Sequence, residues 1–232
     1  MHLHKRTLAL IAVLTLLFCM ASRRQTTHPQ IRGKDWDDFS VIIPGNKDLQ
    51  DLWHGILIDT HNDPNTPLPR ITIMSHAPHD RLEDCSKFTG KKKRQCEHDN
   101  QVASQGMTLG EEISPNDPIL LFFDSLHEIM RELAHKYWPM TSTNQRMVRA
   151  IPACFLVHEM LHVALDLRGV PALDQHRVMR DQHYLLHALI HLNKSLGLPP
   201  NGFDVKETMD GLDYSVKLDE ITRRREQREV GN

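Results

Sequence analysis

The sequence has almost no excess charge, no internal repeat and no dense cysteine cluster, and each absence excludes a class of protein. The net charge is −2 over 232 residues, so the chain has no general electrostatic attraction to nucleic acid or to an anionic membrane. No repeat and no long low-complexity linker divides it, which favours one domain over an array of small units. Its four cysteines lack the close C-x-x-C spacing of small metal-binding modules.

Long apolar runs are also scarce. Residues 7–20 form an apolar run that is shorter than the roughly 20 residues needed to cross a bilayer comfortably, and they follow the basic residues Lys5 and Arg6. This arrangement is typical of a secretory signal peptide, and cleavage after Ala21 is expected. A lipoprotein with its lipid anchor at Cys19 and an uncleaved membrane anchor are the alternatives. The sequence therefore predicts an exported protein, periplasmic or secreted, that contacts a membrane only through this segment.

The cysteines agree with export. Cys85 and Cys96 bracket a polar segment, and in an oxidising compartment we expect them to form a disulfide. A loop this short would gain about 3 kcal/mol at most in the entropic model. A metal site at Cys85, Cys96 and His98 is disfavoured by the spacing. Cys154 is expected to be a free, buried thiol, and the basic cluster at residues 91–94 is interpreted as a solvated loop.

The most informative pattern is an H-E-x-x-H motif formed by His158, Glu159 and His162 inside an apolar stretch. On an α-helix, residues i and i+4 lie on one face, so both imidazoles can bind one ion. Glu159 lies beside them and can deprotonate a water on that ion. Burying these three polar side chains would be costly unless each has a partner, and a cation supplies one. The alternative is two hydrogen-bonded core histidines with a chance glutamate.

A catalytic zinc ion usually has three protein ligands and an open position, so a third ligand is needed. Residues 172–196 are expected to form a second helix, and this helix holds His176, His183, His187, His191, Asp174 and Asp181. If the turn before it makes the two helices antiparallel, His176 and His183 each lie within about 6 Å, along the axis, of the level of the motif. Geometry alone does not separate these two histidines.

The motif is similar to that of HExxH zinc metallopeptidases, the zincins. Over residues 148–200 the chain has a modest resemblance to SprT-like zincins, because residues 183–199 resemble the helix that begins with that family's third zinc-binding histidine. That helix ends in an Asn-x-x-Leu-Gly-Leu-like stretch, as it does here. The resemblance implies Zn²⁺ held by His158, His162 and His183, with His176 as the alternative third ligand.

The chain departs from the SprT-like pattern at Tyr184, where that family often has glycine, and no zinc-ribbon cysteines follow. A looser similarity is to compact bacterial effector metallopeptidases, whose third ligand is typically a glutamate. No glutamate occurs between Glu159 and Glu207, so that similarity would require Asp174 or Asp181 as the ligand.

Together these features predict an exported zinc-dependent metallopeptidase that hydrolyses peptide bonds of a protein or peptide substrate, with a zinc-bound water activated by Glu159. Tyr184, His187 and Tyr214 are candidate stabilisers of the oxyanion by residue type. The alternative is a secreted, non-catalytic metal-binding or interaction (effector) protein on a zincin fold. Metal storage is disfavoured because 10 of the 16 histidines lie outside residues 158–191 and form no dense tract.

The expected fold class is α+β and zincin-like, with a helix-rich C-terminal half and a small N-terminal sheet over the HExxH helix. Four segments are expected along the chain: a signal peptide at residues 1–21, a flexible lead-in at 22–37, the zincin-like domain at 38–215 and a charged, solvated tail at 216–232. Periodicity places short strands at residues 39–44 and 70–74 and helices at residues 47–58 and 118–137.

The motif helix has recognisable ends. Pro152 suits its first turn, where the missing N–H would have no partner anyway, and Gly169 suits its C-terminal end. The segment at residues 75–117 is rich in polar residues, so we expect irregular structure there with one short helix.

Overall fold

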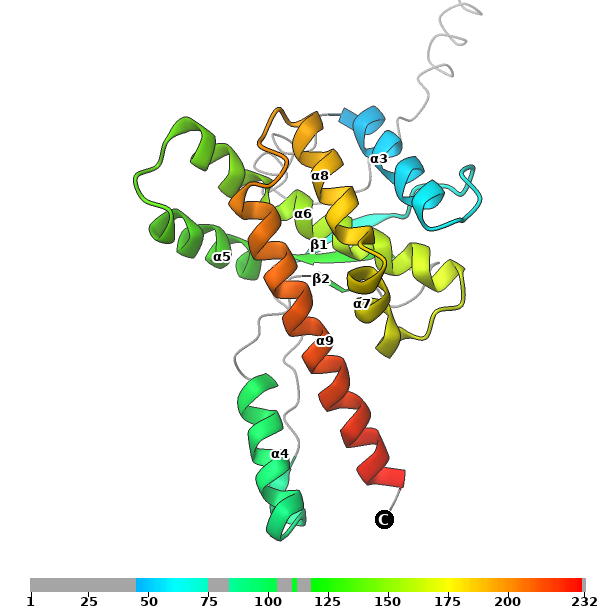
Figure 1. Ribbon diagram of the computed structural model, residues 1–232, viewed down its shortest axis with the longest axis vertical. Coiled ribbons are helices and arrows are strands. Elements are labelled where there is room, and N and C mark those ends of the chain that lie inside the picture. Colours follow the sequence, from blue (N-terminus) through cyan, green and yellow to red (C-terminus); the bar gives the residue numbers. More distant parts are fainter. Residues whose placement is uncertain (1–44, 75–83, 104–109, 112–117, 231–232) are drawn as a thin grey trace, which may run out of the picture. The chain divides into compact units, whose positions relative to one another are not determined.

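The computed structural model describes residues 45–74, 84–103, 110–111 and 118–230, which form a mostly helical fold with one small sheet (Figure 1). The expected α+β class and the helix-rich C-terminal half are confirmed. The proposed signal peptide, the lead-in, Cys19 and the strand expected at residues 39–44 lie outside the described residues.

The sheet has three strands in the order β1-β3-β2. β1 (Ile71–Met74), which was predicted, pairs in parallel with β3 (Ile119–Phe122), and β2 (Gly110–Glu111) pairs with β3 in the antiparallel direction. β2 and β3 both contact α6 (Ser142–Leu167), the helix that carries the HExxH motif. The sheet therefore lies against the motif helix.

The prediction of a helix at residues 118–137 is wrong for the first part of that segment. Residues 119–122 form β3, and the helix α5 begins afterwards and spans Phe123–Lys136. The sequence Ile-Leu-Leu-Phe is a continuous apolar run, which fits a strand buried on both faces as well as the buried side of a helix. Pairing with β1 on one side and β2 on the other makes these residues the central strand of the sheet.

The helix predicted at residues 47–58 is confirmed as α3 (Gly45–Asp59). Its expected apolar face packs into the main core through Leu49, Trp53 and Ile56, with Leu52 partly buried at the edge.

The motif helix α6 is longer than expected. It begins after Thr141, whose hydroxyl accepts a hydrogen bond from the Asn144 N–H, so Pro152 lies inside the helix and not in its first turn. Gly169 ends the helix as predicted, with a positive φ of 71° and the Val170 N–H donating to Leu165 O. The helix is long and apolar enough to cross a membrane, but 78% of its most apolar window is buried inside the fold, as expected for a central core helix.

The single helix expected at residues 172–196 is two helices, α7 (Ala172–Asp181) and α8 (Tyr184–Ser195). The break falls at His183, which adopts the left-handed conformation with φ 58°. The last helix, α9 (Phe203–Val230), packs against α6, α7 and α8 and includes most of the segment expected to be a solvated tail. The C-terminal part of the chain is therefore part of the folded domain.

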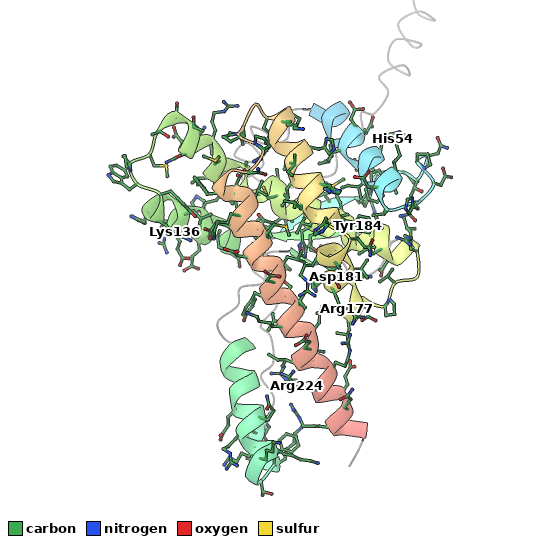
Figure 2. All side chains as sticks on the ribbon, viewed as in Figure 1. His54, Lys136, Arg177, Asp181, Tyr184 and Arg224 are labelled. Atoms are coloured by element: carbon green, nitrogen blue, oxygen red, sulfur yellow. A yellow bond between two sulfur atoms is a disulfide. The ribbon has the colours of Figure 1, made fainter. Side chains whose placement is uncertain are left out.

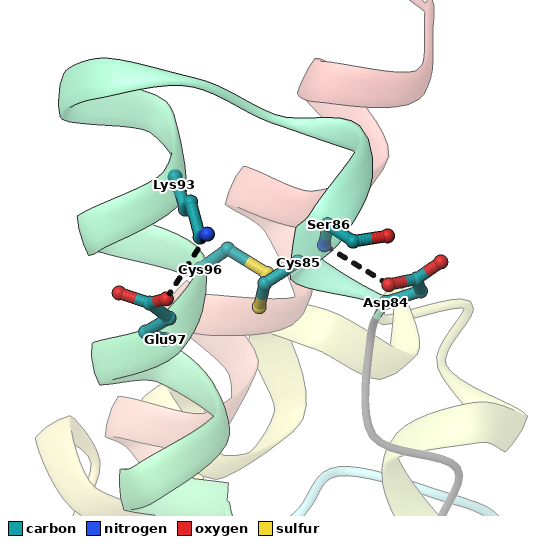
Figure 3. The surroundings of a disulfide bond; sticks show 6 residues. All are labelled: Asp84, Cys85, Ser86, Lys93, Cys96 and Glu97. Atoms are coloured by element: carbon teal, nitrogen blue, oxygen red, sulfur yellow. Dashed lines mark hydrogen bonds and ion pairs between the residues drawn. A yellow bond between two sulfur atoms is a disulfide. The ribbon is translucent and has the colours of Figure 1, made fainter.

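A smaller unit is closed by the expected disulfide between Cys85 and Cys96, which joins the short helix η1 (Cys85–Lys87) to α4 (Gly90–Ala103) (Figure 3). The exposed basic residues 91–94, interpreted as a loop, lie in the first part of α4. This unit lies beside the last turns of α9, where the Arg228 guanidinium is 5.7 Å from the centroid of the Phe88 ring (Figure 1). Cys154 is free and buried, as predicted.

Removal of this disulfide should loosen its own unit and leave the rest of the fold intact. In a Cys85→Ser/Cys96→Ser variant we expect faster proteolysis within residues 84–103, because the cross-link limits the unfolded states of that segment. Limited proteolysis with peptide mapping checks this, and the core helices α6 to α8 serve as the internal reference. Equal cleavage rates in the variant and the parent protein would contradict a stabilising role.

A buried polar cluster joins α8 to the start of α9. Asn193 Nδ2 donates hydrogen bonds to Pro199 O at 2.9 Å and to Asp204 Oδ1 at 3.1 Å, and both side chains are fully buried. Within the described part of the chain, Asn193 Oδ1 and Asp204 Oδ2 make no hydrogen bond. Burial raises the pKa of Asp204 more than the hydrogen bond from Asn193 lowers it. Asn193 Oδ1 and Asp204 Oδ2 are both acceptors, and a proton on Asp204 Oδ2 would turn one of them into a hydrogen-bond donor.

Asp204→Asn should therefore make stability less dependent on pH. A carboxyl group whose pKa is raised by folding stabilises the protein at acidic pH, and this contribution is lost as pH rises from about 4 through the folded-state pKa. Asparagine supplies an N–H donor at every pH and is also suited to the first turn of a helix. In urea unfolding between pH 4 and 8, the free energy of unfolding of the variant should increase relative to that of the parent protein as pH rises. A difference that is constant over this range would mean that Asp204 does not titrate in it.

Candidate metal centre

Helix α6 supplies two imidazoles on one buried face. His158 and His162 are one helical turn apart, and their Nε2 atoms are 3.1 Å from each other. His158 is only 8% exposed, and the α6 residues around the pair are apolar and buried. The motif therefore lies in the core of the fold.

A third imidazole comes from α7. The chain reverses direction after Gly169, and His176 in the second turn of α7 places its Nε2 3.1 Å from His162 Nε2. The ligand atoms of His158, His162 and His176 all lie within 4.8 Å of one another. Two nitrogens bound tetrahedrally to one zinc ion at about 2.05 Å are roughly 3.3 Å apart. The spacing in this cluster is thus close to that of a metal site.

Gln175 fixes the orientation of His162. The Gln175 Nε2 donates to the Asp166 carboxylate and, at 3.1 Å, to Val170 O, so its Oε1 faces the imidazole. The Nδ1–H of His162 donates to that oxygen at 2.5 Å. With the proton on Nδ1, the lone pair of His162 lies on Nε2, the atom that faces the other histidines.

Asp219, on α9, fixes the orientation of His176. The Nδ1–H of His176 donates to Asp219 Oδ2 at 2.7 Å, so in the neutral, metal-binding form of the ring the lone pair lies on Nε2. The Nε2 atoms of His162 and His176 are consequently two acceptors 3.1 Å apart. Two lone pairs at this distance repel each other unless a cation lies between them, which is what a bound metal ion provides.

Both histidines of the motif are held neutral. Burial lowers the pKa of His158 well below its ordinary value, and the neighbouring His162 and His176 lower it further. Burial and His176 likewise lower the pKa of His162 to about 3, although the hydrogen bond to Gln175 acts in the opposite direction. Neutral imidazoles are the form that binds a metal ion.

One carboxylate contacts the cluster and a second is its neighbour in sequence. Asp219 accepts a hydrogen bond from His176, and Glu159 follows His158 on α6 and is 6% exposed. A nearby cation lowers the free energy of a buried carboxylate. These residues fit a divalent metal ion with nitrogen ligands, as imidazole prefers.

The structure corrects the preferred third ligand. His183 lies at the break between α7 and α8, is exposed, and is not part of the cluster, whereas the alternative, His176, is. The reason is that residues 172–196 do not form one straight helix, so residues seven apart no longer share a face. Asp174 and Asp181 are also not part of the cluster; Asp174 pairs with Arg177 and Arg223, and Asp181 pairs with Arg180.

The candidate oxyanion stabilisers remain predictions. Tyr184 begins α8, and its hydroxyl accepts a hydrogen bond from Arg168 at 3.3 Å (Figure 2). His187 is exposed on the same helix, and Tyr214 is partly buried on α9, where burial raises its pKa.

Sequence reasoning missed Gln175 and Asp219. Asp219 was placed in the solvated tail, yet it continues a buried stripe on α9 formed by Leu212 and Val216 at helical spacing. Extending that period past residue 216 would have indicated that Asp219 faces the core. Gln175 carries no comparable signal, because a glutamine next to a histidine is common on exposed helices.

Comparisons of the chain with family models, with curated proteins and with solved structures give no match.

Replacement of single histidines should identify the third ligand. We expect His176→Ala to lose the bound metal, because two imidazoles from one helix leave the ion with too few protein ligands, and His183→Ala to keep it. Metal content of the purified proteins by inductively coupled plasma mass spectrometry checks this. Metal retained in His176→Ala and lost in His183→Ala would overturn the assignment.

Asp219→Asn should weaken metal binding without removing a ligand. Replacing a carboxylate that accepts a hydrogen bond from a ligating histidine typically reduces metal affinity about 10- to 100-fold. Competition with a chromophoric chelator measures this affinity. Asp213→Asn, at an exposed position six residues earlier on α9, is the matched control and should leave the affinity unchanged.

Proposed function

We propose that this protein is an exported zinc-dependent metallopeptidase that hydrolyses peptide bonds. The observation that carries the proposal is the convergence of the ligand nitrogens of His158, His162 and His176, together with the burial of Glu159, the residue that follows His158 on α6. Zinc is the ion of choice because three histidines are a common ligand set for catalytic zinc and leave its fourth position open.

The fold around the cluster supports this function. The motif helix is covered by a small sheet, as expected for a zincin-like domain, and two further helices contribute His176 and Asp219. The Cys85–Cys96 disulfide is compatible with an oxidising compartment and hence with export. The substrate we propose is protein or peptide, and membrane contact would be limited to the N-terminal segment.

When bound, the ion would lower the pKa of a coordinated water and polarise the carbonyl of the scissile peptide bond. The residues of the chain orient the ligands and transfer the proton. His162 and His176 are held by Gln175 and Asp219, so their rings need not reorient when the substrate binds.

Glu159 is the general base and then the general acid. Its carboxylate takes a proton from the attacking water while the water oxygen forms a bond to the carbonyl carbon. The carbon–nitrogen bond then breaks, and Glu159 passes the proton to the leaving nitrogen. The products are a carboxylic acid, which keeps the second proton of the water and then releases it to the amine or to solvent, and a free amine, and Glu159 returns to its starting charge.

A Glu159→Gln variant tests the proposal. Glutamine keeps the size of the side chain but cannot accept the proton, so we expect normal zinc content and a loss of hydrolysis of about 100- to 10,000-fold. Cleavage can be followed with a proteome-derived peptide library and mass spectrometry of new amino termini. Glu132→Gln, at an exposed position on α5, is the control and should retain full activity.

The outcomes separate the two functions under consideration. Cleavage that depends on Glu159 and on zinc supports the peptidase. Equal cleavage by the parent protein and Glu159→Gln would refute the role of Glu159. Zinc bound at one per chain with no cleavage of any peptide in the library would favour the non-catalytic metal-binding or interaction protein.

A further inference from the structure

Three histidines outside the buried cluster line the exposed face of α8. His183 precedes the first turn, and His187 and His191 follow at intervals of four residues. All three side chains are exposed, while the opposite face of the helix is buried in the core through Leu185, Ala188, Leu189 and Leu192. The histidines therefore form a row on the surface, which we call the α8 histidine row.

Consecutive members of the row are neighbours in space. The His187 N–H donates to His183 O at 3.0 Å, so the helical hydrogen-bond spacing includes His183 despite its positive φ. The ring centroids of His183 and His187 are 6.3 Å apart. Two imidazoles bound through Nε2 to one ion place their ring centroids roughly 5–6 Å apart for bonds of about 2.1 Å. A small rotation of either exposed side chain closes that difference.

The row has no other structural task in the described part of the chain, where none of its three side chains makes a hydrogen bond or an ion pair with the protein. Histidine is also a weaker helix former than lysine, glutamate or glutamine, which are more usual on an exposed helix face. Exposed neutral imidazoles lose little hydration when they bind a metal ion, in contrast to the buried cluster. Imidazole pairs prefer ions such as Zn²⁺, Ni²⁺ and Cu²⁺.

We propose that the α8 histidine row is a second, solvent-exposed binding site for one divalent transition metal ion. His187 is common to both neighbouring pairs, so one ion is held either by His183 and His187 or by His187 and His191, with water completing its coordination. His183 and His191 are two turns apart and do not bind the same ion. This site shares no residue with the buried centre.

Equilibrium dialysis of the full chain against Zn²⁺, with metal content measured by mass spectrometry, tests the proposal. At about 100 μM free zinc we expect His187→Ala to bind one ion fewer per chain than the parent protein. His183→Ala and His191→Ala should each keep this ion with an affinity reduced by a smaller factor, because one pair remains. His135→Ala, which removes an exposed histidine of α5 with no histidine four residues away, should bind as many ions as the parent.

A second measurement identifies the residues directly. Modification of histidines by diethyl pyrocarbonate, mapped by mass spectrometry, should show that zinc protects His187 and leaves His135 reactive. His158→Ala should lose the buried ion and keep the protection of His187, so failure of the buried site is distinguishable from failure of this one. Equal zinc content in His187→Ala and His135→Ala, or no protection of His187, would overturn the proposal.

Discussion

The structure depends on the burial of polar side chains in the central helix of the core. Helix α6 fills the centre of the core, yet His158, Glu159 and His162 lie on it where neighbouring residues are aliphatic. A buried polar atom without a partner destabilises the fold by about 1–3 kcal/mol. His162 has partners on α7, which supplies Gln175 and His176, and α9 supplies Asp219 to hold His176.

Helix α9 links the centre to the rest of the chain. Arg223, one turn beyond Asp219, donates to Leu173 O and to the Asp174 carboxylate and so fixes α9 against the first turn of α7. Both contacts join the helix that carries the third imidazole to the helix that orients it. The position of His176 therefore depends on residues close to the C-terminus, far along the chain from the HExxH motif. Packing of α9, rather than the short loop between α6 and α7 alone, positions the third imidazole.

The parts of this arrangement that follow local rules could be predicted from the sequence. Spacing places His158 and His162 on one helical face, Gly169 ends the helix, and the β-branched run at residues 71–74 forms a strand. The strand β3 was mistaken for helix because a short, wholly apolar run has no distinguishing period. The choice between His176 and His183 failed for a different reason. It depended on where one long helical pattern breaks, and no glycine or proline in the sequence marks His183 as the residue that adopts the left-handed conformation.

Whether a histidine lies on the buried or the exposed face of its helix determines how it can bind a metal ion. His158 and His162 share with His183, His187 and His191 the same four-residue interval, and the interval alone predicts that either set can chelate an ion. On α6 the interval coincides with the buried face, where partners from α7 and α9 orient the rings and burial keeps them neutral. On α8 it coincides with the exposed face, where water surrounds the rings and nothing orients them in advance. A buried, oriented set can hold an ion tightly and leave one position open for chemistry, because its geometry does not change on binding. An exposed pair must order its own side chains when it binds, so its ion exchanges readily with solution, and the two sites on one chain should differ in affinity and in rate of exchange.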